Sequence, residues 1–395
     1  MQLNIFDTIS AKRLLPFTHT RPVADIRCGI LTQRERWEKL LNLSQSGTIT
    51  GKVLSKVFPP IYNSDNLYVN AAILANEAIA EQVAALQNGE ALVAAEVLIA
   101  LRTSEQLTLS DFNNKTISYQ AIPYEANFRM LQNVWDIFGL ADDAIRYDFN
   151  LLSSNVQSEA LPAHNTLIGS AEDLFIAKGA QITAAILNTT TGPIFIDEDA
   201  EVMEGAMLRG PIYLGKHGAF KMGTKVYGAT SIGHHSKVGG ELSNVIMFDY
   251  SNKGHDGYLG NAVIGSWCNL GADTNASNLK NNYDEVSIWS EYENRMVKTG
   301  TQFCGLLMGD HSKCGINTMF NTGTVVGVSC NIYGGDFPDK YIPSFSWGGK
   351  NDMTSYQFDK AIDTARRMMA RRGIQPTAEE IEVLANICEK SQRFN

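Results

Sequence analysis

The side chains best suited to chemistry gather in two stretches of the chain, residues 243–260 and 269–301. The first stretch reads SNVIMFDYSNKGHDGYLG and contains His255. An imidazole titrates near neutral pH, so it can take up a proton from an attacking nucleophile. The second stretch begins with NLGADTNASNLKNNYDEV and continues through an expected hairpin, VSIWSEYENRMVKTG. The residue types therefore indicate a possible general base on a loop.

These two stretches interrupt a regular series of apolar residues that must position them. A branched or bulky apolar residue returns at every sixth position. The first run comprises Ile196, Val202, Leu208, Leu214, Phe220, Val226, Ile232 and Val238, and later members are Ile264, Leu270, Met308, Cys314, Phe320, Val326 and Ile332. A period of six fits neither an amphipathic helix nor an alternating strand, so it indicates a repeat solenoid.

A six-residue unit supplies one short strand and one tight turn, and three units close a triangular coil. The apolar residue points toward the axis, and a small residue such as Ala206 or Ser236 lets the chain bend at the corner. We expect roughly six coils of parallel strands around one apolar column. The unit resembles that of the left-handed parallel β-helix, an exception to the right-handed crossover rule. Loops on such a rigid frame are natural carriers of chemistry.

The amino-acid composition excludes some kinds of binding partner and indicates the cellular compartment. The 395 residues carry a net charge of −9, with 44% hydrophobic residues. This acidity argues against nucleic acid or an anionic membrane as the main partner. The six cysteines form no CxxC pair, which favours a reduced, cytoplasmic protein without a metal site. No stretch approaches the length of about eighteen apolar residues that a membrane span needs, and no export signal is visible.

The chain divides into four expected segments: a small α/β domain at 1–150, a linker with the first coils at 151–190, the β-helix at 191–338, and a helical tail at 339–395. Within the first segment we expect a strand at 92–100 and helices at 32–43 and 128–138. In the tail, Gly373 and Pro376 separate two expected helices.

Residues 254–274, GHDGYLGNAVIGSWCNLGADT, resemble a known motif, GH-x-x-Y-LG-x-x-x-IG-x-x-x-N-x-GA-x-T. The motif belongs to the acetyltransferase half of bifunctional N-acetylglucosamine-1-phosphate uridyltransferase/glucosamine-1-phosphate acetyltransferases. Residues 309–317, GDHSKCGIN, also resemble that family's GxHxxTGIN. The resemblance implies a homotrimer that N-acetylates an amino-sugar 1-phosphate, with acetyl-CoA bound between neighbouring solenoids.

The same resemblance implies roles for five residues. His255 matches the general base, which accepts the proton that the sugar amine loses as it attacks the thioester. Asn278 matches a residue beside this catalytic base, and Tyr258 and Asn269 match contacts to the sugar phosphate. Arg209 matches a phosphate-binding arginine, a role that a planar guanidinium suits.

One departure bears on the substrate. Where the bacterial enzymes have a phosphate-binding lysine just after a motif glutamate, this chain has Leu242 and Ser243 after Glu241. The lysines that follow the family's asparagine motif are also missing from their places, although Lys280 lies next to them. The missing lysines weaken the prediction of a sugar phosphate as the substrate more than they weaken the prediction of acetyl transfer.

Residues 13–22, RLLPFTHTRP, resemble RLxPLTxTRPK of nucleotide-sugar pyrophosphorylases. Those enzymes hold a nucleoside triphosphate on a preceding Gly-rich loop, but here residues 6–12 read FDTISAK, and Val23 replaces the lysine. Arg13 and Arg21 are candidate nucleotide-binding residues that partly substitute. We expect a reduced nucleotidyltransferase-like domain that needs Mg²⁺ and a nucleoside triphosphate only if it is active, and an active pyrophosphorylase is the alternative.

Two other functions stay open. Left-handed β-helices of the γ-type carbonic anhydrases hold zinc with three histidines, and His217, His234, His235 and His255 are candidates for such a site. The second alternative is a non-catalytic trimeric scaffold. Zinc content tests the first alternative, and acetyl-CoA binding tests the second.

Overall fold

The computed structural model describes residues 1–154 and 156–392, which form two compact units. The first unit contains Met1–Arg27, Leu31–Asp136 and Ala378–Leu384, and the second contains Cys28–Ile30 and Ile137–Thr377 with the end of the last helix. The boundary lies at residue 136 rather than at the expected 150. Two helices, α5 (Asp136–Gly139) and α6 (Ala141–Ser153), account for the difference, because α6 packs the ring of Phe149 edge-on against Phe195 of the second unit.

The first unit is built on a six-stranded sheet in the order β2-β1-β3-β6-β5-β7. Its strands are β1 (Gln2–Phe6), β2 (Ser46–Ile49), β3 (Asn66–Asn70), β5 (Glu90–Ala94), β6 (Val97–Thr103) and β7 (Gln120–Pro123). The helices of this unit are α1 (Ser10–Arg13), α2 (Gln33–Leu40), α3 (Glu77–Ala85) and α4 (Leu109–Asn114). Strands β2, β1 and β3 are parallel, so their carboxyl ends meet at one edge of the sheet.

The sequence expectations for this unit are confirmed in part. Helix α2 begins after Thr32, whose side chain forms a capping box with Glu35. The strand expected at 92–100 is instead a hairpin of β5 and β6, because the chain turns at Ala95, which adopts a φ of 49°. The helix expected at 128–138 is wrong: a short strand, β8 (Arg129–Met130), pairs with β4 (Ile73–Leu74), and α5 begins only at Asp136.

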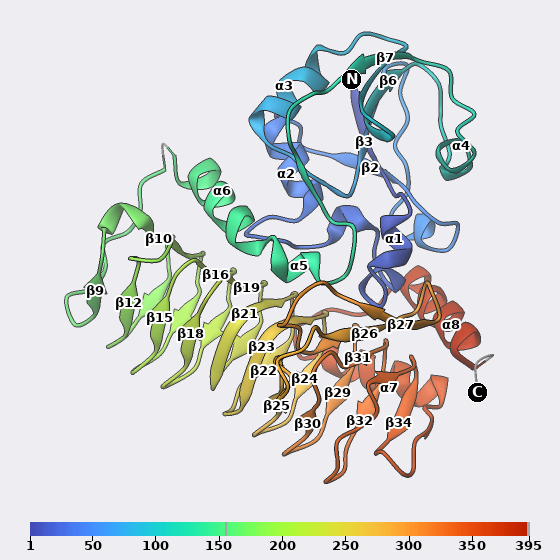
Figure 1. Cartoon of the computed structure of the whole chain (residues 1–395). Coiled ribbons are helices and arrows are strands. Elements are labelled where there is room, and N and C mark those ends of the chain that lie inside the picture. Colours follow the sequence, from blue (N-terminus) through green and yellow to red (C-terminus); the bar gives the residue numbers. More distant parts are fainter. Residues whose placement is uncertain (155, 393–395) are drawn as a thin grey trace. The chain divides into compact units, whose positions relative to one another are not determined.

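The second unit is a parallel β-solenoid, and the predicted left-handed hexapeptide β-helix is confirmed (Figure 1). Equivalent residues in the regular coils are eighteen apart, as Ile194 pairs with Ile212 and Ile212 with Thr230. The inward side chains form one continuous apolar column that includes Val202, Phe220 and Val238. The solenoid has about ten turns rather than roughly six, because coils also form before Ile196 and after Ile332.

Each coil visits three faces in turn. The first face contains β9 (Thr166–Ile168), β12 (Ile186–Asn188), β15 (Met207–Arg209), β18 (Lys225–Tyr227), the starts of β21 (Glu241–Met247) and β23 (Tyr258–Ile264), β25 (Asn275–Ala276) and β30 (Met319–Phe320). The second face contains β10 (Leu174–Ile176), β13 (Ile194–Ile196), β16 (Ile212–Leu214), β19 (Thr230–Ile232), the ends of β21 and β23, β28 (Leu307–Met308), β31 (Val325–Val326) and β33 (Tyr341–Ile342). The third face contains β11 (Gln181–Ile182), β14 (Glu201–Val202), β17 (Ala219–Phe220), β20 (Lys237–Val238), β22 (Asn252–Lys253), β24 (Asn269–Leu270), β29 (Lys313–Cys314), β32 (Asn331–Ile332) and β34 (Ser346–Gly348), to which β35 (Thr354–Ser355) adds an antiparallel strand.

A column of aromatic rings runs along the corner between the second and third faces. Its members are His217, His235, Tyr250, Trp267 and His311, and all five adopt a positive φ. Ring centroids of successive members are 4.7, 4.9, 4.2 and 6.4 Å apart, and each pair is stacked. We name this column the ring ladder. Stacking offsets the cost of the left-handed backbone that each corner residue adopts.

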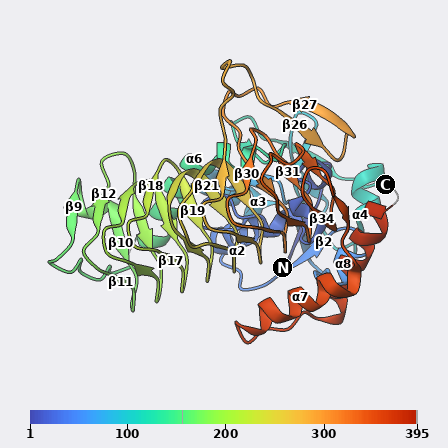
Figure 2. The same cartoon turned by 90° about the horizontal axis from the view of Figure 1, so that it is seen from below.

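The hairpin expected within 286–300 is confirmed as β26 (Ser287–Ser290) and β27 (Arg295–Lys298), and it projects from the side of the solenoid (Figure 2). The two tail helices are also confirmed, as α7 (Phe358–Ala370) and α8 (Ala378–Gln392). Tyr356, just before α7, packs edge-on against Trp347 of β34 with ring centroids 4.6 Å apart. Arg372, just after α7, donates a hydrogen bond of 3.3 Å to the carbonyl oxygen of His235, so α7 lies against the solenoid.

The six cysteines are all buried free thiols. Across residues 1–154 and 156–392, no helix combines the length and the apolar character needed to cross a bilayer.

Candidate functional site

His255 lies at the corner where β22 on the third face leads into β23 on the first face. Its side chain is exposed and lines a cleft of about 610 Å³, which we name the His255 cleft. The walls come from the same corner of neighbouring coils, with Gly240 on one side and Asp273 on the other. Gly240 has a φ of +78°, and a Cβ there would lie 2.5 Å from the carbonyl oxygen of Gly257. Glycine is therefore required for the coils to approach each other below the histidine.

A buried lysine lies directly beneath this corner. Lys253 pairs in register with Val238 and so occupies an inward position in the column that is otherwise apolar. Its Nζ donates to the carbonyl oxygens of His255 at 2.8 Å, Asp256 at 2.9 Å and Gly239 at 3.3 Å. Burial lowers the pKa of Lys253 to about 8. The ammonium thus ties the loop that carries His255 to the coil below.

Sequence reasoning missed Lys253, although a signal was present. The apolar series breaks after Val238, and Lys253 stands where the next coil needs an inward residue. A lysine at such a position needs hydrogen-bond acceptors from the surrounding backbone, because an isolated buried charge is strongly unfavourable.

Tyr258 and Asn278, which the sequence motif singled out, are in direct contact on the first face. The Nδ2 of Asn278 donates to the Oη of Tyr258 at 3.2 Å and to the Oδ1 of Asn261 at 2.8 Å. Gly260 makes room for this cluster, since a Cβ there would lie 2.3 Å from the Oη of Tyr258. Burial raises the pKa of Tyr258, so its hydroxyl remains a neutral donor and acceptor. Tyr258 begins the strand that follows the His255 corner, but neither Tyr258 nor Asn278 is among the residues that line the His255 cleft.

Arg209 is on the same face but away from this cluster. It ends β15, and β18 and β21 separate that strand from β23, which corresponds to roughly 14 Å at the usual strand spacing. Between them the Oη of Tyr227 donates to the Oε1 of Glu241 at 2.7 Å, and this carboxylate raises the pKa of Tyr227 to about 12. The structure therefore does not bring Arg209 to the Tyr258 cluster.

Asn269 is also placed elsewhere. It projects outward from β24 on the third face, in register with Asn252 and Lys313. There it lines a second cleft beside α7 rather than the His255 cleft. The motif match gave the residue but not the face on which its side chain lies.

The other histidines have structural contacts. His217 and His235 stack on each other in the ring ladder, and the Nδ1 of His234 accepts the backbone N–H of Lys216 at 3.1 Å. Among the residues that the structure describes, no three His, Cys, Asp or Glu side chains lie close enough together to hold a metal ion. Within one chain, the four histidines therefore do not assemble a zinc site.

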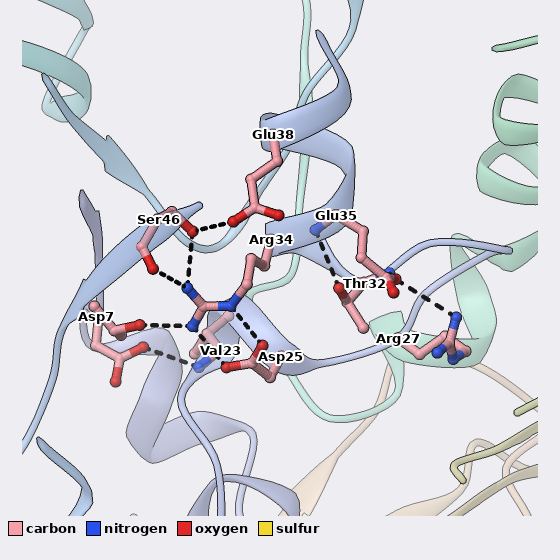
Figure 3. Close-up of polar contacts among 10 residues, drawn as sticks. Asp7, Val23, Asp25, Arg27, Thr32, Arg34, Glu35, Glu38 and Ser46 are labelled. Carbon is pink, nitrogen blue, oxygen red and sulfur yellow. Dashed lines mark hydrogen bonds and ion pairs between the residues drawn. The ribbon is translucent and has the colours of Figure 1, made fainter. Parts of the chain in front are cut away.

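The carboxyl edge of the parallel strands in the first unit carries a buried aspartate (Figure 3). Asp7 follows β1 directly, and its Oδ1 accepts the backbone N–H of Val23 at 2.9 Å. Its Oδ2 accepts the hydroxyl of Thr50 at 2.5 Å. Val23 stands where the resemblance expects a phosphate-binding lysine. The backbone N–H at this position donates to the carboxylate of Asp7 and is therefore already used within the chain. An anionic phosphate would meet an acidic group there instead of a cation.

The cation nearest to this edge is already paired. Arg34 forms a bidentate ion pair with Asp25, with N···O distances of 2.7 and 2.8 Å. It also donates to the Oγ of Ser46 at 2.8 Å (Figure 3) and to the Oγ1 of Thr48 at 2.6 Å. With Asp7 and Asp25 both engaged by the chain's own donors, these residues do not fit a site for Mg²⁺ and a triphosphate.

The two predicted nucleotide-binding arginines lie close by in the sequence but differ in exposure. Arg13 ends α1 and is exposed, whereas Arg21 is half-buried and follows the 3₁₀ turn at Phe17–His19. Their role in nucleotide binding stays a prediction.

Burial of Asp7 makes the free energy of unfolding depend on pH, and this dependence can be measured. Burial raises the pKa from 3.8 to about 6, so between these values the folded chain keeps a proton that the unfolded chain has released. The free energy of unfolding should therefore fall as the pH rises from about 4 to about 6, by about 3 kcal/mol in total. We expect Asp7→Asn to remove this dependence and to stabilise the first unit at pH 8, because an amide can bond both Val23 and Thr50. Calorimetric melting of the full chain at pH 4.5 and 8 measures the effect.

Asp25→Asn is the matched control. It leaves Arg34 without its bidentate carboxylate, so the thermal midpoint should fall at both pH values. An Asp7→Asn protein less stable than the parent at pH 8 would show that the carboxylate is a net stabilising group, contrary to this prediction.

Comparisons with known proteins agree with the resemblance seen in the sequence. Residues 3–157 match the family model described as sugar nucleotidyl transferase. The chain is 29% identical over 146 residues to a bifunctional sugar-1-phosphate nucleotidylyltransferase/acetyltransferase of Sulfurisphaera tokodaii, covering 36% of each chain. It is 30% identical over 123 residues to the bifunctional protein GlmU of Methanocaldococcus jannaschii, covering 31% of this chain and 28% of that one. The chain thus spans about a third of the length of these curated transferases.

Among solved structures, the polySia-specific acetyltransferase NeuO is similar over 54% of this chain and 99% of that one, with 12% identity and a TM-score of 0.31. A Vibrio cholerae hexapeptide-repeat acetyltransferase, VCA0836, solved with acetyl coenzyme A, covers 39% of this chain and 70% of its own, with 16% identity and a TM-score of 0.19.

Proposed function

We propose that the chain is an acyltransferase that moves the acetyl group of acetyl-CoA to the amine of an amino-sugar 1-phosphate. The observation that carries the proposal is the His255 corner, where an exposed imidazole lines a cleft. The Tyr258–Asn278 contact lies on the first face, which the chain enters directly after this corner. His255 and Tyr258 belong to one coil, and Asn278 belongs to the next. The similarity to bifunctional acetyltransferases supports the same reaction.

In this reaction the amine nitrogen attacks the thioester carbonyl carbon. His255 accepts the proton that the nitrogen loses, and the C–S bond breaks to release CoA, whose thiolate is then protonated. Backbone N–H groups at the glycine-rich corner are suited to stabilise the oxyanion of the tetrahedral intermediate. Asn278 holds the Tyr258 hydroxyl, so that the two together present a fixed polar surface to the sugar phosphate. Arg209 and Asn269 contribute to this site only if a neighbouring subunit supplies them.

A homotrimer is part of the proposal. Met222 and Ile316, which line the His255 cleft, are each 71% exposed, and large apolar side chains are seldom left so open. A second copy of this chain packed along the solenoid would cover them and complete the cleft. Sedimentation equilibrium of the full chain gives the subunit number, and a monomer at micromolar concentration would contradict this part.

We further propose that the first unit does not transfer nucleotidyl groups. The reason is the carboxylate of Asp7 at the position where a triphosphate would need a cation, together with the paired state of Arg34. Production of pyrophosphate from UTP and a sugar 1-phosphate with Mg²⁺ would overturn this point and favour the active pyrophosphorylase.

The test of the main proposal is a direct assay. The full chain is mixed with acetyl-CoA and glucosamine 1-phosphate, and release of the free CoA thiol is followed with a thiol reagent. We expect release that depends on the sugar, with one acetylated amine formed for each thiol. If folded protein releases no CoA thiol with both substrates present, the proposal is contradicted. Zinc-dependent hydration of carbon dioxide would favour the carbonic anhydrase alternative.

A further inference from the structure

A second cleft lies on the third face of the solenoid, beside α7. Its volume is about 530 Å³. The floor is one outward residue from each of four successive coils: Lys237, Asn252, Asn269 and Lys313 stand in register on neighbouring strands. Tyr250 and Trp267 of the ring ladder form one edge. We name this the basic cleft.

Five cationic side chains converge on the basic cleft. Lys237 and Lys313 come from the solenoid, and Arg367, Arg371 and Arg372 come from α7 and its carboxyl end. Among the residues that the structure describes, no aspartate or glutamate lines it. Within the part of the chain that the structure describes, none of the five forms an ion pair with a carboxylate. This arrangement is unexpected in a chain whose net charge is −9.

The fold does not by itself balance these charges. The carboxyl end of a helix carries a partial negative charge of about one half. This charge neutralises part of the charge of one arginine and leaves the other cations unbalanced. Lys313 has only one protein acceptor in the structure, the carbonyl oxygen of His311 at 2.8 Å, and burial lowers the pKa of Lys313 to about 8. Like charges held together in a partly buried space repel each other, and an anion placed among them removes that repulsion.

Two further features narrow the class of anion. The amides of Asn252 and Asn269 lie between the two lysines of the row, and each amide both donates and accepts hydrogen bonds. The rings of Tyr250 and Trp267 are stacked on each other and on their ring-ladder neighbours, so they present only their edges to the cleft, where a flat ring of the ligand can meet them edge-to-face. A ligand with phosphates for the cations and a base or ribose for the amides matches all of these groups.

We propose that the basic cleft binds the diphosphate-bearing part of a nucleotide ligand, held by Arg367, Arg371 and Lys313. This goes beyond the proposed acetyl transfer, and it does not require His255 to be catalytic. The same chemistry occurs in CoA and in nucleotide sugars, and the experiment separates these two sources.

The first measurement is calorimetric titration of the full chain with inorganic pyrophosphate. We expect one site per chain, weakened by about tenfold or more in the variant Arg367→Ala/Arg371→Ala, because two charge-assisted contacts are lost. Arg366→Ala is the matched control: this arginine lies on the same helix, is ion-paired with Asp363, and does not line the cleft. It should bind pyrophosphate within about twofold of the parent.

Absence of pyrophosphate binding, or equal weakening by Arg366→Ala, would overturn the proposal. Displacement of pyrophosphate by CoA supports it and identifies the acyl donor as the ligand, whereas displacement by UDP-N-acetylglucosamine alone supports it and identifies a nucleotide sugar. Failure of both to displace pyrophosphate would overturn the assignment to a nucleotide. His255→Ala should keep pyrophosphate binding, so failure of the proposed acetyl transfer and failure of this inference give different results.

Discussion

Replacing His255 with alanine is expected to lower kcat for acetyl transfer by about two to four orders of magnitude, the range typical for a general base. The side chain is exposed at the His255 cleft and, among the described residues, makes no hydrogen bond or ion pair. Its backbone carbonyl keeps the hydrogen bond from Lys253 in the alanine variant. The solenoid should therefore fold unchanged, and the loss should appear in turnover rather than in thermal stability. Thiol release at saturating acetyl-CoA and sugar measures it.

His217→Ala is the matched control for this experiment. His217 is also a half-exposed corner histidine of the solenoid, but it belongs to the ring ladder and does not line the His255 cleft. It should keep activity within about twofold of the parent, as surface substitutions away from a site usually do. A His255→Ala protein that retains a third or more of the parental kcat would exclude His255 as the base.

Replacing Lys253 with methionine is expected to separate activity from stability. The pKa of this lysine falls from 10.5 to about 8 in the fold, so the folded state releases the proton first, and stability rises as the pH goes from about 8 to about 10.5. At neutral pH the charged form therefore costs about 3 kcal/mol relative to a neutral lysine. An apolar side chain at this inward position removes that cost, so the methionine variant should melt near or above the parent.

The acetyl transfer rate should nevertheless fall by about 10- to 100-fold, because a small misplacement of a catalytic group has effects of this size. Without the ammonium, the carbonyls of His255 and Asp256 lose their common donor and the loop is no longer tied to the coil below. The loss should lie in kcat, with the KM for acetyl-CoA changed by less than about threefold, since the side chain of Lys253 is fully buried.

Leu270→Met is the control for packing, because Leu270 is the inward residue of the following coil and the exchange nearly conserves volume. It should keep both stability and activity. If Lys253→Met leaves kcat unchanged, then Lys253 does not position the loop. A strongly lowered thermal midpoint would instead contradict the stability prediction, because it would show that the three hydrogen bonds outweigh the cost of the buried charge.

The sequence predicted the solenoid well because its signal is local and repeated. Each inward residue, such as Leu214 or Phe220, contacts mainly its equivalents one coil away, so the period of six directly encodes the register. His255 and Tyr258 come from the resemblance of residues 254–274 to a known motif rather than from the period, and their roles stay predictions. The number of coils was underestimated, because the units before Ile196 and after Ile332 depart from the six-residue series.

What the sequence did not predict depends on contacts between distant segments. The basic cleft forms because α7 packs against the third face. The sequence around Lys237 and Lys313 does not indicate that this helix packs there. The positions of Asn269 and Arg209 depend on which face each strand occupies, and a motif match carries no information on this. In the first unit, the hairpin at Ala95 lies within residues 92–100, which are apolar except for Glu96 and therefore also fit a single strand.

The eighteen-residue coil also sets the unit in which this chain can change length. Deleting eighteen residues between Ile194 and Thr230 would remove one whole turn and return every later residue to its own face. Deleting a single six-residue unit would instead rotate everything downstream by a third of a turn, so that inward side chains keep their partners while the His255 corner moves to a different edge of the prism. Insertions and deletions that preserve the site should therefore come in multiples of three units, whatever their sequence.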